Sequence, residues 1–104
     1  MLDKKVAELI NKQVNREFYS GYLYLDFANY YNEVGLDGFA HYFDIQAQEE
    51  RDHAMLMRMY LFNNGEKVTF TEIAKPDMEC KEIEDALRHS LKHEQYVTSL
   101  INKI

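Results

Sequence analysis

The stretch that decides the fold is Gln46–Met57, which reads QAQEERDHAMLM. It contains Glu50 and His53, which are three residues apart. On an α-helix, residues with this spacing are neighbours on one face, with roughly 5–6 Å between their Cβ atoms. A carboxylate and an imidazole placed in this way can hold the same metal ion.

This pair lies where the surrounding segment predicts a buried face. Apolar side chains recur in steps of three and four, as in an amphipathic helix. Glu50 takes one position of this stripe and His53 borders it. The stripe consists of Phe39, Phe43, Ala47, Glu50, Ala54, Met57 and Leu61. An ionisable side chain facing a core is costly unless it is paired, hydrogen-bonded or bound to a metal, so Glu50 is a candidate metal ligand.

Length and composition narrow the class of protein. The chain has 104 residues, 46% of them hydrophobic and 29% charged, which fits one small soluble helical domain. Its formal net charge of −6 argues against a nucleic-acid partner. Cys80 is the only cysteine, which excludes an internal disulfide and a cysteine-rich metal site. With no signal-peptide pattern and no membrane-spanning run, the sequence predicts a cytoplasmic protein without a membrane partner.

Two long helices are predicted before the crossover. The first covers about residues 3–34, with Asp3 as its N-cap and Gly35 as a left-handed stop. The second covers about residues 38–64, with Asp37 as its N-cap and a stop at Gly65. The short turn between them makes the helices antiparallel neighbours. The stripe of the first helix is Val6, Ile10, Val14, Glu17, Gly21, Tyr24, Ala28 and Tyr31.

Glu17 thus occupies the middle of the first stripe, as Glu50 does in the second. Counted from the turn, the two glutamates differ in level by roughly 7 Å at 1.5 Å per residue. Helix tilt and the long glutamate side chain can close that gap. The simpler interpretation of an isolated glutamate is a residue at the stripe edge that pairs with Lys or Arg.

A third helix is expected over about residues 81–104. The polar connection before it, about residues 65–80, exceeds the usual 2–8 residues and suits a crossover along a bundle, although a mobile surface loop is the alternative. Glu94 again interrupts an apolar stripe, which consists of Ile83, Leu87, Leu91, Glu94, Val97, Ile101 and Ile104. Because three inward carboxylates would repel one another in a core, a metal site between the helices is the simplest account.

The fold expected from these patterns is therefore an all-α bundle of long helices with one long crossover, in which the third helix runs parallel to the second. The chain, residues 1–104, supplies three helices of this single domain. The apolar period is still running at Ile104 without a stop signal, so we expect a bundle that is C-terminally incomplete or completed by another chain. A carboxylate-rich site with one histidine per metal favours iron or manganese over zinc.

Over its whole length the sequence resembles the haem-free bacterial ferritins. The resemblance rests on Glu17 with Tyr24, on AQEERDHA at Ala47–Ala54, and on LKHEQ at Leu91–Gln95. It implies a di-iron ferroxidase site that takes up iron ions, in a homo-oligomeric shell of 24 subunits that stores ferric mineral. The implied reaction is oxidation of Fe(II) to Fe(III) by dioxygen or peroxide. The fold it implies is an all-α, ferritin-like four-helix bundle, up-down-down-up with one long crossover, of which this chain supplies helices one to three. Members of this family continue with a fourth long helix that brings a further Glu and Gln to the centre.

Site residues follow from this resemblance, position by position. Glu17, Glu50 and His53 would hold one iron, and Glu50 would bridge to a second iron that Glu94 also holds. Tyr24 would hydrogen-bond the site as its catalytic tyrosine and candidate electron donor. The last assignment is Glu49, which matches a residue that helps hold a third iron in some members.

Arg51 stands where haem-containing relatives place a ligating methionine directly after the bridging glutamate. The resemblance therefore implies no haem. Two other classes remain open: a truncated or metal-free helical assembly module, and a rubrerythrin-like di-iron peroxidase. The peroxidase class should carry a second Glu-x-x-His and usually a cysteine-rich iron site.

The remaining histidines are expected to be solvated residues on helix faces. They are His41, His89 and His93. Although His93 precedes Glu94, adjacent residues on a helix point about 100° apart. Cys80 is expected to lie at the start of the third helix.

Overall fold

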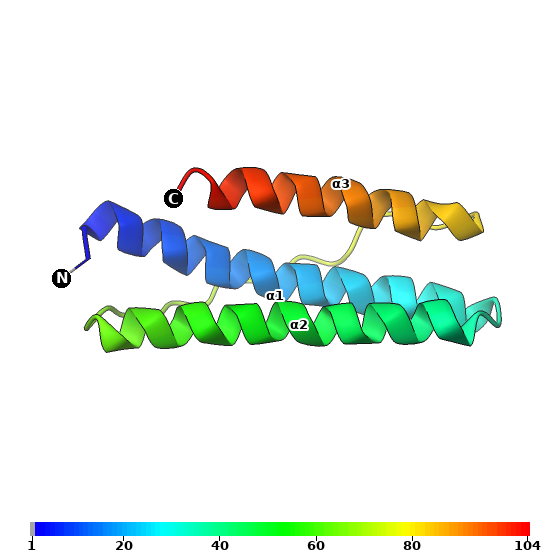
Figure 1. Ribbon diagram of the computed structural model, residues 1–104, viewed down its shortest axis with the longest axis horizontal. Helices are drawn as coiled ribbons and strands as arrows, with labels where there is room; N and C mark the ends of the chain where they lie inside the picture. Colours follow the sequence, from blue (N-terminus) through cyan, green and yellow to red (C-terminus); the bar gives the residue numbers. More distant parts are fainter. Residues whose placement is uncertain (1) are drawn as a thin grey trace.

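Three helices form in the computed structural model, which describes residues 2–104 and contains no strand within them. They are α1 (Lys4–Glu33), α2 (Asp37–Asn63) and α3 (Ile83–Ile101). The helices lie lengthwise in a body of 49 × 20 × 20 Å, with α2 antiparallel to α1 and α3 parallel to α2 (Figure 1). Within residues 2–104, no helix has the length and apolarity that crossing a membrane requires.

Local sequence signals set the helix ends. The Asp3 side chain accepts a hydrogen bond from the Lys5 amide at 2.8 Å and so caps α1. Gly35 and Gly65 have φ of 80° and 71°, which confirms that both are left-handed stops. The expected cap of α2 is wrong: Leu36 is the cap, and Asp37 is the first helical residue. There its carboxylate still meets the positive end of the helix dipole.

An aromatic cluster fills the core between α1 and α2. The ring centroid of Phe43 on α2 lies 5.7 Å from that of Tyr31 and 5.5 Å from that of Phe27, both on α1. All three side chains are buried. Most of the predicted stripe of α2 is buried with them, but Phe39 is 42% exposed because it lies at the end of the helix pair.

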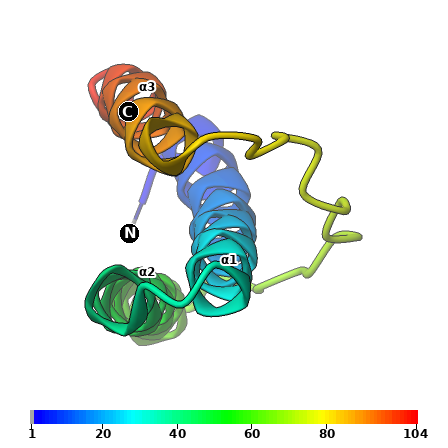
Figure 2. The same cartoon turned by 90° about the vertical axis from the view of Figure 1, so that its right-hand side faces the viewer.

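The third helix packs through a different face from the one predicted. Of its stripe, Val97 is buried, while Leu87 and Leu91 are 38% and 62% exposed. The buried residues of α3 instead include Ala86 and His93. The reason is geometric: α3 packs on α1 alone, and no Cα atoms of the described helices α2 and α3 lie within 8 Å of each other (Figure 2). The apolar stripe of α3 therefore faces the open side of the bundle.

Two asparagines hold the crossover against α1. The Thr69 amide donates to Asn11 Oδ1 at 2.8 Å, and the Thr71 amide donates to Asn15 Oδ1 at 2.8 Å. Both asparagine amide groups donate in return to the Thr69 carbonyl at 3.0 Å. Cys80 belongs to this crossover and not to the start of α3, because Glu82 is the cap of that helix.

We predict that Asn15→Ala loosens the crossover without unfolding the helices. The change removes the acceptor of the Thr71 amide and one donor to Thr69, which should cost about 1–2 kcal/mol of stability. Hydrogen exchange followed by mass spectrometry should show faster exchange around Thr71. The control is Asn29→Ala, the same change at an exposed position of α1. Equal exchange in the two variants would contradict the prediction.

Candidate metal centre

Three potential ligands meet where α1 and α2 run side by side. Glu17 comes from α1, and Glu50 and His53 come from α2; one ligand atom from each lies within 4.8 Å of the others. His53 Nδ1 is 3.6 Å from Glu50 Oε2 and 3.9 Å from Glu17 Oε2. The difference in level expected between the two glutamates is thus closed by their side chains.

Burial differs among these groups. Glu17 and Glu50 are 1% and 5% exposed, whereas the His53 side chain is 52% exposed. Glu17 Oε2 has no hydrogen-bond partner in the part of the chain that the structure describes. The cluster therefore offers a cation two buried carboxylates and an imidazole at an edge open to solvent.

Gly21 permits the close approach of the two helices here. A Cβ atom at this position would lie 3.2 Å from the Ala47 carbonyl oxygen and 3.8 Å from Glu50 Cβ. A contact of 3.2 Å to a backbone oxygen is tighter than most Cβ contacts, so a side chain here would push α1 and α2 apart by a few tenths of an ångström. The missing side chain therefore lets the two helices pack closely beside Glu50 and beside Glu17, which lies one turn earlier on α1.

Burial and negative charge act together on Glu50. Desolvation, followed by the neighbouring Glu17 and Glu94 carboxylates, raises the pKa of Glu50 to about 9. Without a cation, Glu50 therefore holds a proton at neutral pH. A bound cation would favour the ionised carboxylate and displace this proton.

Tyr24 and Glu94 join α3 to this region. The buried Tyr24 hydroxyl donates a hydrogen bond to the Glu94 carboxylate. Burial, and then the carboxylates of Glu94, Glu50 and Glu17, raise the pKa of Tyr24 far above its usual range, so the phenol keeps its proton. Glu94 is exposed and lies outside the three-residue group, but its charge acts on Glu50. Its bridging role stays a prediction.

Two of the histidines expected in solvent are not there. His93 is 6% exposed, and its Nε2 lies 2.6 Å from Ser20 Oγ on α1. Burial lowers the pKa of His93, which favours the neutral ring. The half-buried His89 ring stacks on the Phe27 ring, with 6.2 Å between the ring centroids. Both corrections have one cause: α3 packs on α1 through a different face from the one predicted, and that face carries these two side chains.

Glu49 and Gln13 lie near the three-residue group in sequence but were assigned differently: Glu49 was a candidate ligand and Gln13 was not. Glu49 is exposed and the structure does not bring it into the three-residue group, so its role stays a prediction. Gln13, which was not a candidate, is fully buried and donates to Glu17 Oε1 at 3.0 Å. The signal for Gln13 was its position four residues before Glu17, at the distance of one helical turn.

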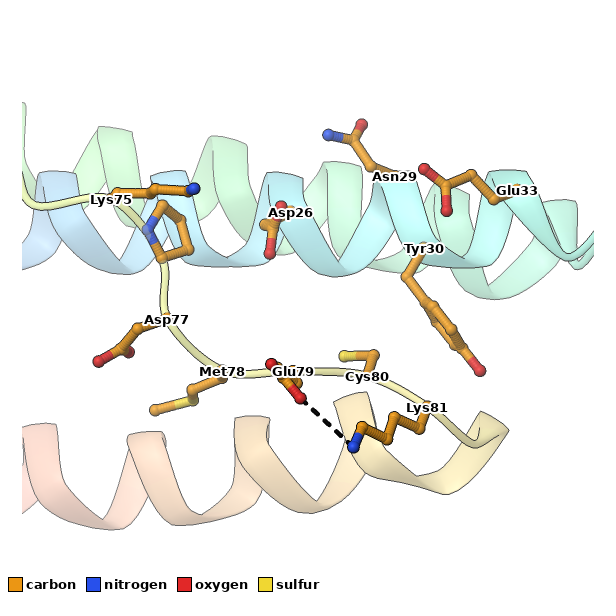
Figure 3. Close-up of a pocket in the computed structure, with 11 residues that line it drawn as sticks. Asp26, Asn29, Tyr30, Glu33, Lys75, Asp77, Met78, Glu79, Cys80 and Lys81 are labelled. Carbon is orange, nitrogen blue, oxygen red and sulfur yellow. Dashed lines mark ion pairs between the residues drawn. The ribbon is translucent and has the colours of Figure 1, made fainter.

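A pocket of about 730 Å³ lies elsewhere, between α1 and the crossover (Figure 3). Its lining mixes both charges and includes Asp26, Glu33, Lys75, Asp77, Glu79 and Lys81. Lys81 and Glu79 pair with each other at 3.6 Å, and both side chains are 79% exposed. Among the described residues, only Glu17, Glu50 and His53 bring three potential ligand atoms together, so this carboxylate–histidine group remains the candidate centre.

Comparison with known proteins gives one consistent answer. Residues 7–104 match the family model described as a ferritin-like domain. The bacterial non-heme ferritin of Campylobacter jejuni is 35% identical over 104 residues, and that of Staphylococcus haemolyticus is 35% identical over 98 residues. These alignments cover 100% and 94% of this chain but 62% and 59% of the relatives, so the chain spans about three fifths of their length.

Solved structures agree with the sequence relatives. An engineered closed form of the Archaeoglobus fulgidus ferritin superposes with a TM-score of 0.95 at 36% identity, over 99% of this chain and 63% of that one. A humanized archaeal ferritin gives the same TM-score at 38% identity, again over 99% and 63%. The predicted all-α, ferritin-like bundle is thereby confirmed, with this chain forming part of it. The chain belongs to the family of proteins with a ferritin-like domain.

Proposed function

We propose that this chain carries the ferroxidase centre of a haem-free, iron-storing ferritin. Fe(II) is the substrate, held first by Glu17, Glu50 and His53, with Glu94 completing a second, bridged position. The observation that carries the proposal is that one ligand atom from each of three side chains lies within 4.8 Å of the others. Two of these side chains are buried carboxylates. In a core these carboxylates are unfavourable without a cation.

The donor set suits this chemistry. Carboxylate oxygens with one imidazole nitrogen match the preferences of iron, and their negative charge stabilises Fe(III) more than Fe(II). Each Fe(II) gives up one electron, and dioxygen or peroxide accepts the electrons. The exposed edge of His53 gives the ion a route from solvent to the buried carboxylates.

Tyr24 supports the centre through Glu94. Its phenol remains protonated and donates to the Glu94 carboxylate. That hydrogen bond holds one Glu94 oxygen and leaves the other for an ion shared with Glu50. Because Tyr24 lies on α1 and Glu94 on α3, the hydrogen bond also sets the position of α3 along α1, beside the centre.

Assembly into a cytoplasmic shell of 24 subunits belongs to the same proposal. Exposed apolar side chains on α1 and the crossover support association between copies, because they lie together in one hollow and are not scattered singly over the surface. Tyr22 and Leu25 of α1 are 51% and 46% exposed, and Ile73 of the crossover, which lines the same hollow, is 45% exposed.

An anaerobic Fe(II) titration followed by addition of dioxygen tests the proposed function. We expect stoichiometric binding to the wild-type protein and then oxidation to Fe(III), with affinity at least about tenfold weaker in His53→Ala, because even residues that support metal ligands contribute that much. The control is His41→Ala, the same change at an exposed site on α2. Absence of stoichiometric binding by the wild-type protein would instead support a metal-free assembly module.

A further inference from the structure

Gln13 is an unusual occupant of the α1 core. Its side chain is fully buried, one turn before Glu17, and its Nε2 donates to Glu17 Oε1 at 3.0 Å. Its own carbonyl oxygen, Oε1, has no hydrogen-bond partner within residues 2–104. A buried acceptor without a partner lowers the stability of a fold.

Packing alone therefore does not account for this glutamine. Its neighbour Val14 is buried without any such penalty, and an apolar side chain of equal volume would fill the space at position 13. The one hydrogen bond that Gln13 makes goes to a proposed ligand. What distinguishes glutamine from an apolar residue here is its effect on the Glu17 carboxylate.

That effect is to make the two oxygens of Glu17 unequal. Oε1 is occupied by the Gln13 amide, while Oε2 has no hydrogen-bond partner in the described part of the chain and lies 3.9 Å from His53 Nδ1. We infer that Gln13 is a positioning residue, which holds Glu17 so that Oε2 alone is presented to the metal. The inference rests on the proposed metal-binding function.

Partners that orient ligands in this way contribute measurably to metal affinity. Removing one typically weakens binding 10–100-fold, because the freed ligand must be ordered when the ion binds. Gln13→Met keeps nearly the same volume and removes the amide donor. Gln13→Asn keeps the amide but shortens its reach by one methylene, so it tests the hydrogen bond without changing the polarity.

The chain offers a matched control. Gln48 on α2 donates to Asp52 Oδ1 at 3.0 Å, with the same four-residue spacing, but both residues are exposed. Gln48→Met therefore removes an equivalent helical hydrogen bond away from the proposed ligands. The experiment is a calorimetric titration of the full chain with Zn²⁺, together with thermal unfolding of each metal-free variant and the visible absorption spectrum of the Co²⁺ form.

We expect Gln13→Met and Gln13→Asn to bind Zn²⁺ about 10–100-fold more weakly, with the Co²⁺ spectrum altered. Gln48→Met should match the wild-type protein in Zn²⁺ affinity and in the Co²⁺ spectrum. The unfolding temperature of metal-free Gln13→Met should change little, because the substitution removes the unpartnered Gln13 Oε1 but also leaves Glu17 Oε1 without its donor. Wild-type affinity in both Gln13 variants would overturn this inference alone, as would an affinity loss that merely follows lost thermal stability. Failure of the wild-type protein to bind metal stoichiometrically would overturn the proposed function as well.

Discussion

In the metal-free protein, the stability that protonated Glu50 contributes is expected to be lost as the pH rises from about 5 to about 9. In the unfolded chain Glu50 would release its proton near 4.5, whereas burial and the neighbouring carboxylates hold it to about pH 9 in the folded protein. Between these values the folded state binds more protons, so raising the pH favours unfolding. The ceiling for one proton is about 1.4 kcal/mol per pH unit. The contribution is complete below pH 4.5 and gone above pH 9.

Glu50→Gln isolates this contribution from other titrating groups. Glutamine keeps the shape of the side chain but cannot ionise, so the difference in stability between the variant and the wild-type protein should grow with pH in favour of the variant. Urea unfolding at several pH values between 5 and 9 measures it. The control, Glu49→Gln, changes an exposed neighbour and should run parallel to the wild-type protein. A constant difference between Glu50→Gln and the wild-type protein would contradict the assigned environment of Glu50.

Phe43→Ala is expected to have the largest effect on folding. The Phe43 ring is 1% exposed and packs between the rings of Tyr24, Phe27 and Tyr31. Removing a buried phenyl group costs about 3–5 kcal/mol through lost burial and the cavity that remains. Since whole domains are stable by only about 5–15 kcal/mol, the variant should be partly or wholly unfolded at 37 °C.

Urea unfolding followed by circular dichroism checks this expectation. The matched control is Phe62→Ala, also on α2, where the ring is 46% exposed and lies 4.9 Å from the Arg58 guanidinium carbon. That contact is worth about 0.5–1 kcal/mol, so the control should stay folded. Comparable losses in the two variants would show that the aromatic cluster does not carry the stability of the α1–α2 pair.

Features of the sequence that act locally were the ones that predicted the structure well. The glycine stops at Gly35 and Gly65 depend on one residue's backbone freedom, and both have positive φ. The buried positions of Glu17 and Glu50 followed from periodicity, because α1 and α2 cover each other along their stripes. The ligand roles that the resemblance implied remain predictions, since geometry alone does not show a bound ion.

What could not be predicted was which neighbour each face would meet. The stripe on α3 reads as a core face, yet Leu91 is 62% exposed because α2 does not reach α3. For the same reason the side chain of His93, beside that stripe, turns inward to Ser20. Gln13 was missed because a polar residue next to a stripe looks solvated until its hydrogen-bond partner, here Glu17, is itself found to be buried.

The absence of contact between α2 and α3 has a consequence for local unfolding. Because α1 is the only helix that α3 contacts, we expect α3 to detach while the α1–α2 hairpin stays folded, as a separate cooperative unit. An ion held jointly by Glu50 and Glu94 would join α2 to α3 directly. Its binding free energy would then add to the free energy of opening α3, so occupancy of the centre would determine whether the three helices unfold in one step or two.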